Sequence, residues 1–140
     1  LSKEEWANIK ESEALPSSTE LFGKDFVGAE VIKPTKEMLK VGDLAKRIAE
    51  RLLGIRISIQ FLKWKSDYRA EFGNRCLTFN VSKLSKSFWE YPVKAETISL
   101  ILHELAHESG QHTEMSYQEC LSEMAGKLVV IALKEPEFFE

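Results

Sequence analysis

The spacing of the apolar residues changes abruptly at Gly54, and this change constrains the fold more than any other feature of the chain. Before the glycine, apolar residues recur every three or four positions from Val41 to Leu52, which is the spacing of one face of an α-helix. After it, apolar and polar residues alternate from Ile55 to Phe61, as in a half-buried β-strand. Because glycine is suited to the left-handed conformation that often ends a helix, we expect a helix followed directly by a strand.

The rest of the chain adds strands and then helices. Residues 77–81 alternate after a Gly73-Asn74 turn and predict a second strand, paired antiparallel with the first through a long loop. A third strand is expected at Phe26–Ile32, and helices are expected over residues 93–108 and 116–133. This order predicts an α+β fold in which a short, mainly antiparallel sheet packs on the two C-terminal helices.

Length and composition favour one globular domain. The chain has 140 residues, of which 44% are hydrophobic and 29% charged, and its net charge of −3 gives no overall positive field to attract nucleic acid. The longest apolar run, residues 128–133, is far shorter than the roughly 20 residues that a membrane-spanning helix needs. We divide the chain into an N-terminal arm, residues 1–34, with a short helix over residues 1–14 and the strand at Phe26–Ile32, and a main domain, residues 35–140, which contains all three histidines.

The cysteines and the first residues suggest a compartment. Cys76 and Cys120 can form at most one bridge, which is unlike the disulfide density of small secreted domains. The first residues are too charged for a secretory signal, so we expect a cytoplasmic protein. Because the chain begins with Leu1 rather than methionine, we expect it to be part of a longer protein.

The three histidines of the chain all lie between positions 103 and 112. His103 and His107 belong to an HExxH pattern, in which histidines four residues apart share one helix face and can bind one zinc ion. Glu104 lies between them without having to bind the metal and is the candidate general base. The apolar residues of the same segment fall on roughly the opposite side of the helix, so we expect the imidazoles to face away from the core.

A catalytic zinc ion takes three protein ligands and one water, so a third ligand is expected nearby. His112 is favoured because Gly110 allows the chain to turn back toward the first two histidines. Glu123 is the alternative. Glu119 is a weaker candidate because Ser116 and Glu119 have the spacing of a helix capping box, and both glutamates lie opposite the apolar face of the last helix.

Two further residues are candidates for roles beside the metal. Tyr117 is a candidate catalytic residue whose hydroxyl would stabilise a developing oxyanion; alternatively, it is a buried aromatic residue with a satisfied hydroxyl. Glu96 lies about two turns before the histidine pair on the same helix face, where it either contacts a metal ligand or is a solvated charge.

The segment HELAHESGQH resembles the HExxH zinc peptidases called zincins, in particular compact forms in which a histidine soon after the HExxH helix completes the site. It is also similar to the metzincin pattern HExxHxxGxxH, although His112 comes one residue early. LAKRIAERLLGIRISIQF, LTFNVSKL and HELAHESGQHTEMSYQECLSEMAGKL together resemble the C-terminal metallopeptidase-like segment attached to bacterial GHKL ATPase proteins, the superfamily that includes histidine kinases. That resemblance implies a small zincin-like domain with an ATPase domain of the same parent protein as a partner.

These observations predict a zinc metallopeptidase, a hydrolase in which Glu104 takes a proton from a water activated by zinc at His103, His107 and His112. The substrate would be a polypeptide, aligned along the strand at residues 77–81 if that strand lies at a sheet edge. The alternative is a zinc-binding interaction or regulatory module of a larger protein, without peptidase activity. We expect neither nucleic acid nor a membrane as a partner.

Overall fold

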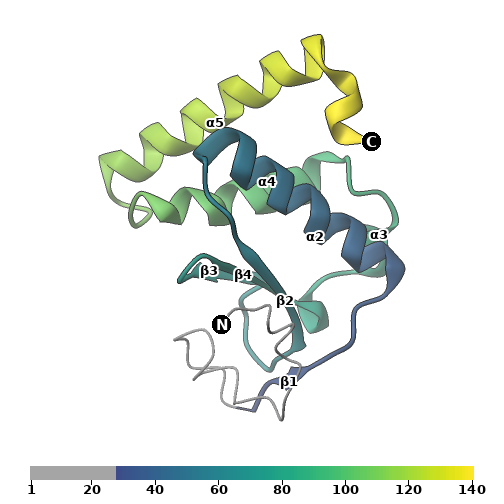
Figure 1. Ribbon diagram of the computed structural model, residues 1–140. Coiled ribbons are helices and arrows are strands. Elements are labelled where there is room, and N and C mark those ends of the chain that lie inside the picture. The colour runs from purple at the N-terminus through teal and green to yellow at the C-terminus, as the bar shows by residue number, and fades with distance from the viewer. Residues whose placement is uncertain (1–27) are drawn as a thin grey trace.

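The computed structural model describes residues 28–140 as an α+β fold in which helices cover one face of a small mixed sheet (Figure 1). The strands are β1 (Glu30–Val31), β2 (Ser58–Lys63), β3 (Ala70–Gly73) and β4 (Cys76–Asn80). The α-helices are α2 (Lys36–Ile48), α3 (Lys86–Glu90), α4 (Ala95–Leu105) and α5 (Met115–Lys134). Short helical turns are η1 (Ala49–Leu53), η2 (Val81–Lys83), η3 (Ala106–Glu108) and η4 (Pro136–Phe139).

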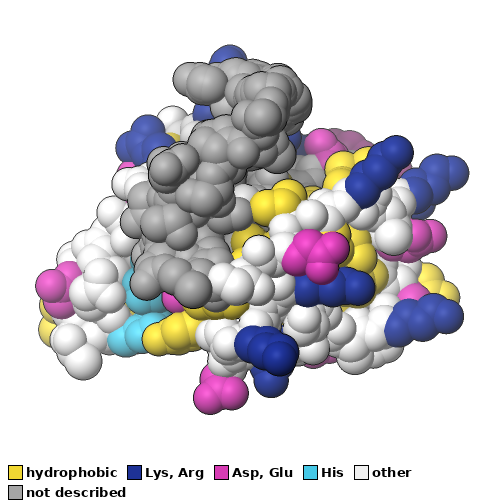
Figure 2. Space-filling model, turned by 90° about the horizontal axis from the view of Figure 1, so that it is seen from below, with side chains coloured by type: hydrophobic (Ala, Val, Ile, Leu, Met, Phe, Trp, Pro, Cys, Tyr) yellow, Lys and Arg dark blue, Asp and Glu magenta, His cyan; other side chains and the backbone are white. Residues whose placement is uncertain are grey.

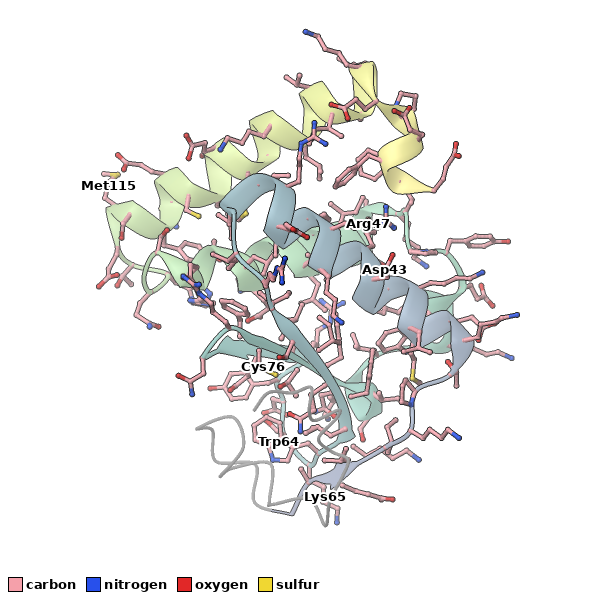
Figure 3. The ribbon with its side chains drawn as sticks, viewed as in Figure 1. Asp43, Arg47, Trp64, Lys65, Cys76 and Met115 are labelled. Carbon is pink, nitrogen blue, oxygen red and sulfur yellow. The ribbon has the colours of Figure 1, made fainter. Side chains whose placement is uncertain are left out.

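Local sequence signals define both ends of the first described helix. The backbone N–H of Met38 donates to the Thr35 hydroxyl at 3.2 Å, which caps α2. At the other end, α2 widens into the π-helical turn η1, and Gly54 then adopts a left-handed φ of 69°. On the outer side of α2, Arg47 and Asp43 point toward each other at 3.0 Å (Figure 3). The expected helix and its glycine cap are confirmed.

The sheet has the strand order β1-β2-β4-β3, with β2 and β4 parallel at its centre and antiparallel pairings at both edges. The antiparallel pairing expected between β2 and β4 is therefore wrong. The cause is β3, a short strand that the alternation pattern does not reveal. Asn74 and Arg75, with φ values of 52° and 56°, form the tight turn that folds β4 back onto β3. The chain thus reverses twice between β2 and β4, which makes them parallel.

The expected N-terminal elements are described only in part. Within the described residues, the strand expected at Phe26–Ile32 is the two-residue strand β1. The helix expected over residues 1–14 lies outside the described residues, as do Phe26 and Val27.

The apolar face of the sheet packs against α2, α3 and α4 to form the core. Phe61 of β2 and Phe79 of β4 stack with ring centroids 5.7 Å apart, and Trp89 meets both rings edge-on. Trp89 and the buried Phe88 come from α3, a helix that the sequence pattern did not predict. α5 lies on the far side of α4 from the sheet (Figure 1).

The two C-terminal helices agree with expectation. α4 with η3 covers most of residues 93–108, and α5 begins one residue before the expected range and ends one residue after it. No helix in residues 28–140 combines the length and apolar character that crossing a membrane requires.

Candidate metal centre

α4 turns its histidines away from the core that it helps to form. Ile101, Leu102 and Leu105 are buried, whereas the His103 side chain is 46% exposed. After Leu105 the helix tightens into η3, which carries His107. Histidine side chains are visible at the molecular surface in Figure 2. The expected orientation of the HExxH histidines is confirmed.

The turn between η3 and α5 brings His112 back toward the other two histidines. Gly110 has a φ of 152°, and a Cβ atom at this position would collide with the Glu114 carboxylate. That carboxylate accepts a hydrogen bond from the Gln111 N–H at 2.9 Å. The Gln118 amide donates to the His112 carbonyl oxygen at 3.1 Å. Gly110 and these hydrogen bonds together give the turn the shape that brings His112 close to the other two histidines.

The start of α5 differs from the expected capping box. α5 begins at Met115, so Ser116 lies inside the helix, and its hydroxyl donates to the Ser109 carbonyl at 2.7 Å. The capping box expected from Ser116 to Glu119 is therefore wrong, because the serine bonds the preceding turn instead. Glu119 and Glu123 are nevertheless both exposed, and neither joins the histidines.

The imidazoles of His103, His107 and His112 converge, each offering one nitrogen, and these nitrogens lie within 4.8 Å of one another. The Nε2 atoms of His103 and His112 are 2.9 Å apart. The Nδ1 atom of His107 lies 3.0 Å from the Gly110 carbonyl oxygen. Because a carbonyl can only accept, Nδ1 carries the hydrogen and Nε2 keeps its lone pair. The three histidines thus form a group that can bind a metal ion.

The electrostatic surroundings favour a neutral His103. Burial lowers the pKa of His103, and positive charge on His112 and then on His107 lowers it further. The neutral ring is the form of histidine that binds metals.

Glu104 lies beside the histidines on a more buried side of α4. Its side chain is 10% exposed, and one carboxylate oxygen lies 4.0 Å from the Nε2 atom of His103. Glu104 is not one of the three converging ligands. The Glu104 carboxylate therefore lies near the imidazole nitrogens but is not one of the candidate metal ligands.

Tyr117 of α5 packs directly under the three histidines. Its ring centroid lies 4.9 Å from that of His107 and 5.0 Å from that of His112. Its hydroxyl donates to the His103 carbonyl oxygen at 2.8 Å, so the hydroxyl is engaged with the backbone. Burial raises the pKa of this hydroxyl, and the charges of Glu104 and Cys120 add to that effect. This placement matches the second of the two roles considered for Tyr117, the buried aromatic residue with a satisfied hydroxyl.

A cleft of about 460 Å³ runs along α4 beside His103 and Glu104. Residues 67–70, which lead into β3, form the opposite wall. Arg69 of this wall donates to the Glu96 carboxylate of α4 at 3.0 Å, so Glu96 is engaged by an arginine rather than by a histidine. The cleft could not be expected from the sequence because its far wall depends on the position of β3.

A scan against protein-family models found no match to this chain, and searches of curated proteins and of solved structures found none either.

Proposed function

We propose that the chain is a zinc-dependent metallopeptidase with a zincin-like fold, acting on polypeptides. The observation that carries the proposal is the convergence of three imidazole nitrogens within 4.8 Å. Two neighbouring features support it: Glu104 lies 4.0 Å from His103, and an open cleft passes beside both residues.

The donor set suits zinc. Neutral imidazole nitrogens are preferred zinc ligands, and three protein ligands leave the fourth position open for water or substrate. The hydrogen bond from the Nδ1 atom of His107 to the Gly110 carbonyl fixes the ring and leaves the lone pair of Nε2 available for a metal. When bound, zinc would supply a water of lowered pKa and polarise a peptide carbonyl group.

Glu104 would move the proton in this reaction. Its carboxylate accepts a proton from the attacking water and returns it to the nitrogen of the leaving amine. The limited exposure of Glu104, 10% of its side chain, restricts the positions that the carboxylate can take, and its distance of 4.0 Å from the Nε2 atom of His103 would keep it near a metal held by the histidines. Tyr117 positions His103 by bonding its carbonyl oxygen.

β3 would align the substrate. Among the described residues, β3 pairs with β4 along one side only, and its first residue, Ala70, lines the cleft beside His103. An extended peptide can add to such an edge through backbone hydrogen bonds. The strand first considered for this role, residues 77–81, lies in the middle of the sheet, so β3 takes its place in the proposal.

Metal content and turnover of a matched pair of variants test the proposal. The chain, purified without chelator, should contain about one zinc ion, and a denatured protein substrate should be cleaved in a chelator-sensitive manner. Glu104→Gln should keep the zinc and lower turnover by about 10²- to 10⁴-fold, because the amide cannot accept the proton. Glu119→Gln, at an exposed glutamate outside the histidine group, should keep both zinc and turnover.

Three results would contradict the proposal. A chain that binds no zinc after zinc has been supplied has no metal centre of this kind. Turnover of Glu104→Gln within about threefold of the wild type would exclude Glu104 as the general base. Zinc binding without chelator-sensitive turnover on any substrate would favour the interaction or regulatory module over the peptidase.

A further inference from the structure

The C-terminal half of α5 exposes an apolar stripe on the side away from the core. Val129, Val130 and Leu133 are 58%, 51% and 79% exposed. Together with Gly126 they recur every three or four residues along one helix face, while buried residues such as Leu128 lie on the opposite face. Single apolar residues are normal on a protein surface, but a contiguous stripe marks an interaction surface.

We propose that this stripe, Gly126, Val129, Val130 and Leu133, binds the same stripe of a second copy of the chain, with the two α5 helices antiparallel. A two-fold axis midway between Val129 and Val130 places Val129 against Val130 of the second copy. The same register places Leu133 against Gly126 of the second copy. A Cβ atom built at Gly126 meets no other atom within 4 Å, so the incoming leucine has room.

A groove beside Gly126 enlarges that space. It lies between η1 and α5, measures about 440 Å³, and is lined by Leu52, Val130 and Ile131 among other residues. Removing Leu133 of the second copy from water into this groove would favour association through the hydrophobic effect. Size complementarity between glycine and leucine thus supports a second copy as the occupant.

The charges beside the stripe complement each other in the antiparallel arrangement. Glu123 and Lys134 are both exposed and lie three helical turns apart on the same edge of the stripe. In the proposed register Lys134 of the second copy lies opposite Ala125, about 3 Å along the helix axis from Glu123 and within reach of an ion pair. In a parallel two-fold pair this edge of one helix would face the opposite edge of the other helix, so Glu123 and Lys134 of the two copies would not meet. The charge pattern therefore favours an antiparallel second copy.

This interface does not depend on the metal centre. The histidines contact the beginning of α5, near Met115, whereas the stripe occupies the other half of the helix (Figure 3). The oligomeric state of the full chain can thus be measured with or without zinc, and peptidase activity is not needed as a readout.

Sedimentation equilibrium over a range of concentrations tests the location of the interface. The wild type should shift from 16.0 kDa to twice that mass as its concentration rises. Leu133→Lys should stay monomeric where the wild type is dimeric, because a lysine cannot be buried against Gly126. Leu39→Lys, at a leucine of α2 that is 56% exposed, is the matched control and should still form dimers. Circular dichroism confirms that each variant is folded.

A charge exchange tests the orientation. Glu123→Lys and Lys134→Glu should each weaken dimerisation by roughly three- to tenfold, and combining them should restore it. A wild type that stays monomeric at every concentration would overturn the proposal and indicate that a different protein binds the stripe. If the Leu133→Lys variant still forms dimers, the interface does not lie at this stripe. A dimer whose single charge variants are not rescued by the double variant would overturn the antiparallel register.

Discussion

The two ends of α4 are held in different ways. Near its beginning, Thr97 is fully buried, and its hydroxyl donates to the Phe88 carbonyl at 3.2 Å, which joins the helix to the aromatic core. Near its end, His103 is partly exposed, and Tyr117 and the turn that carries His112 hold the site through a few directional hydrogen bonds. The helix buries side chains at both ends, Thr97 at the first and Leu105 at the second, but only the second end carries histidines that a polar turn completes. Stability of the fold and affinity for a metal should therefore respond to different substitutions.

The largest effect on stability is expected in the aromatic core. Phe79 is fully buried against Phe61, Phe88 and Trp89, so Phe79→Ala should lower the free energy of unfolding by about 3–5 kcal/mol. Urea denaturation of the metal-free chain measures this change. Zinc affinity of the folded fraction, measured by competition with a chelating dye, should stay within about twofold because the aromatic partners of the Phe79 ring do not include a histidine.

The control for that substitution is Tyr91→Ala, at a tyrosine that is 69% exposed, where the change should be below about 0.5 kcal/mol. If Phe79→Ala reduced the free energy of zinc binding as much as the free energy of unfolding, the aromatic core and the histidine site would not be energetically independent.

The reverse pattern, a large loss of zinc affinity with little loss of stability, is expected at His112. His112→Ala should weaken zinc binding by more than about 100-fold, since loss of a ligand exceeds the 10- to 100-fold effect of losing a partner that only orients one. Stability of the metal-free chain should change by less than about 0.5 kcal/mol because His112 is exposed. Isothermal titration with zinc measures the first quantity. Glu123→Ala is the control, and a larger loss of affinity there would make the glutamate the third ligand.

The candidate site could largely be predicted because its determinants are local. The spacing of His103 and His107 fixes their common helix face, and Gly110 permits the turn that returns His112. The bond from the Tyr117 hydroxyl to the His103 carbonyl could not be predicted, since it depends on how two helices pack. Local spacing therefore determines which residues can converge, while packing between α4 and α5 determines how they are held.

The sheet could be predicted less well because its topology depends on contacts between distant residues. β3 is four residues long, too short for a clear alternation pattern, and Asn74 and Arg75 adopt the turn conformation without a glycine at either position. Missing β3 turned a parallel pair into an expected antiparallel one and concealed the cleft. The substrate edge assigned to residues 77–81 failed for the same reason.

A smaller effect, on both the free energy of unfolding and the zinc affinity, is expected at Tyr117. Because its buried hydroxyl bonds the His103 carbonyl, Tyr117→Phe should lower the free energy of unfolding by about 0.5–1.5 kcal/mol. The same substitution should weaken zinc binding by roughly tenfold, since His103 loses a partner that positions it. Tyr68→Phe, at a tyrosine that is 59% exposed, should change neither quantity. A Tyr117→Phe chain that lost stability but kept wild-type zinc affinity would show that Tyr117 supports the fold without positioning the metal ligands.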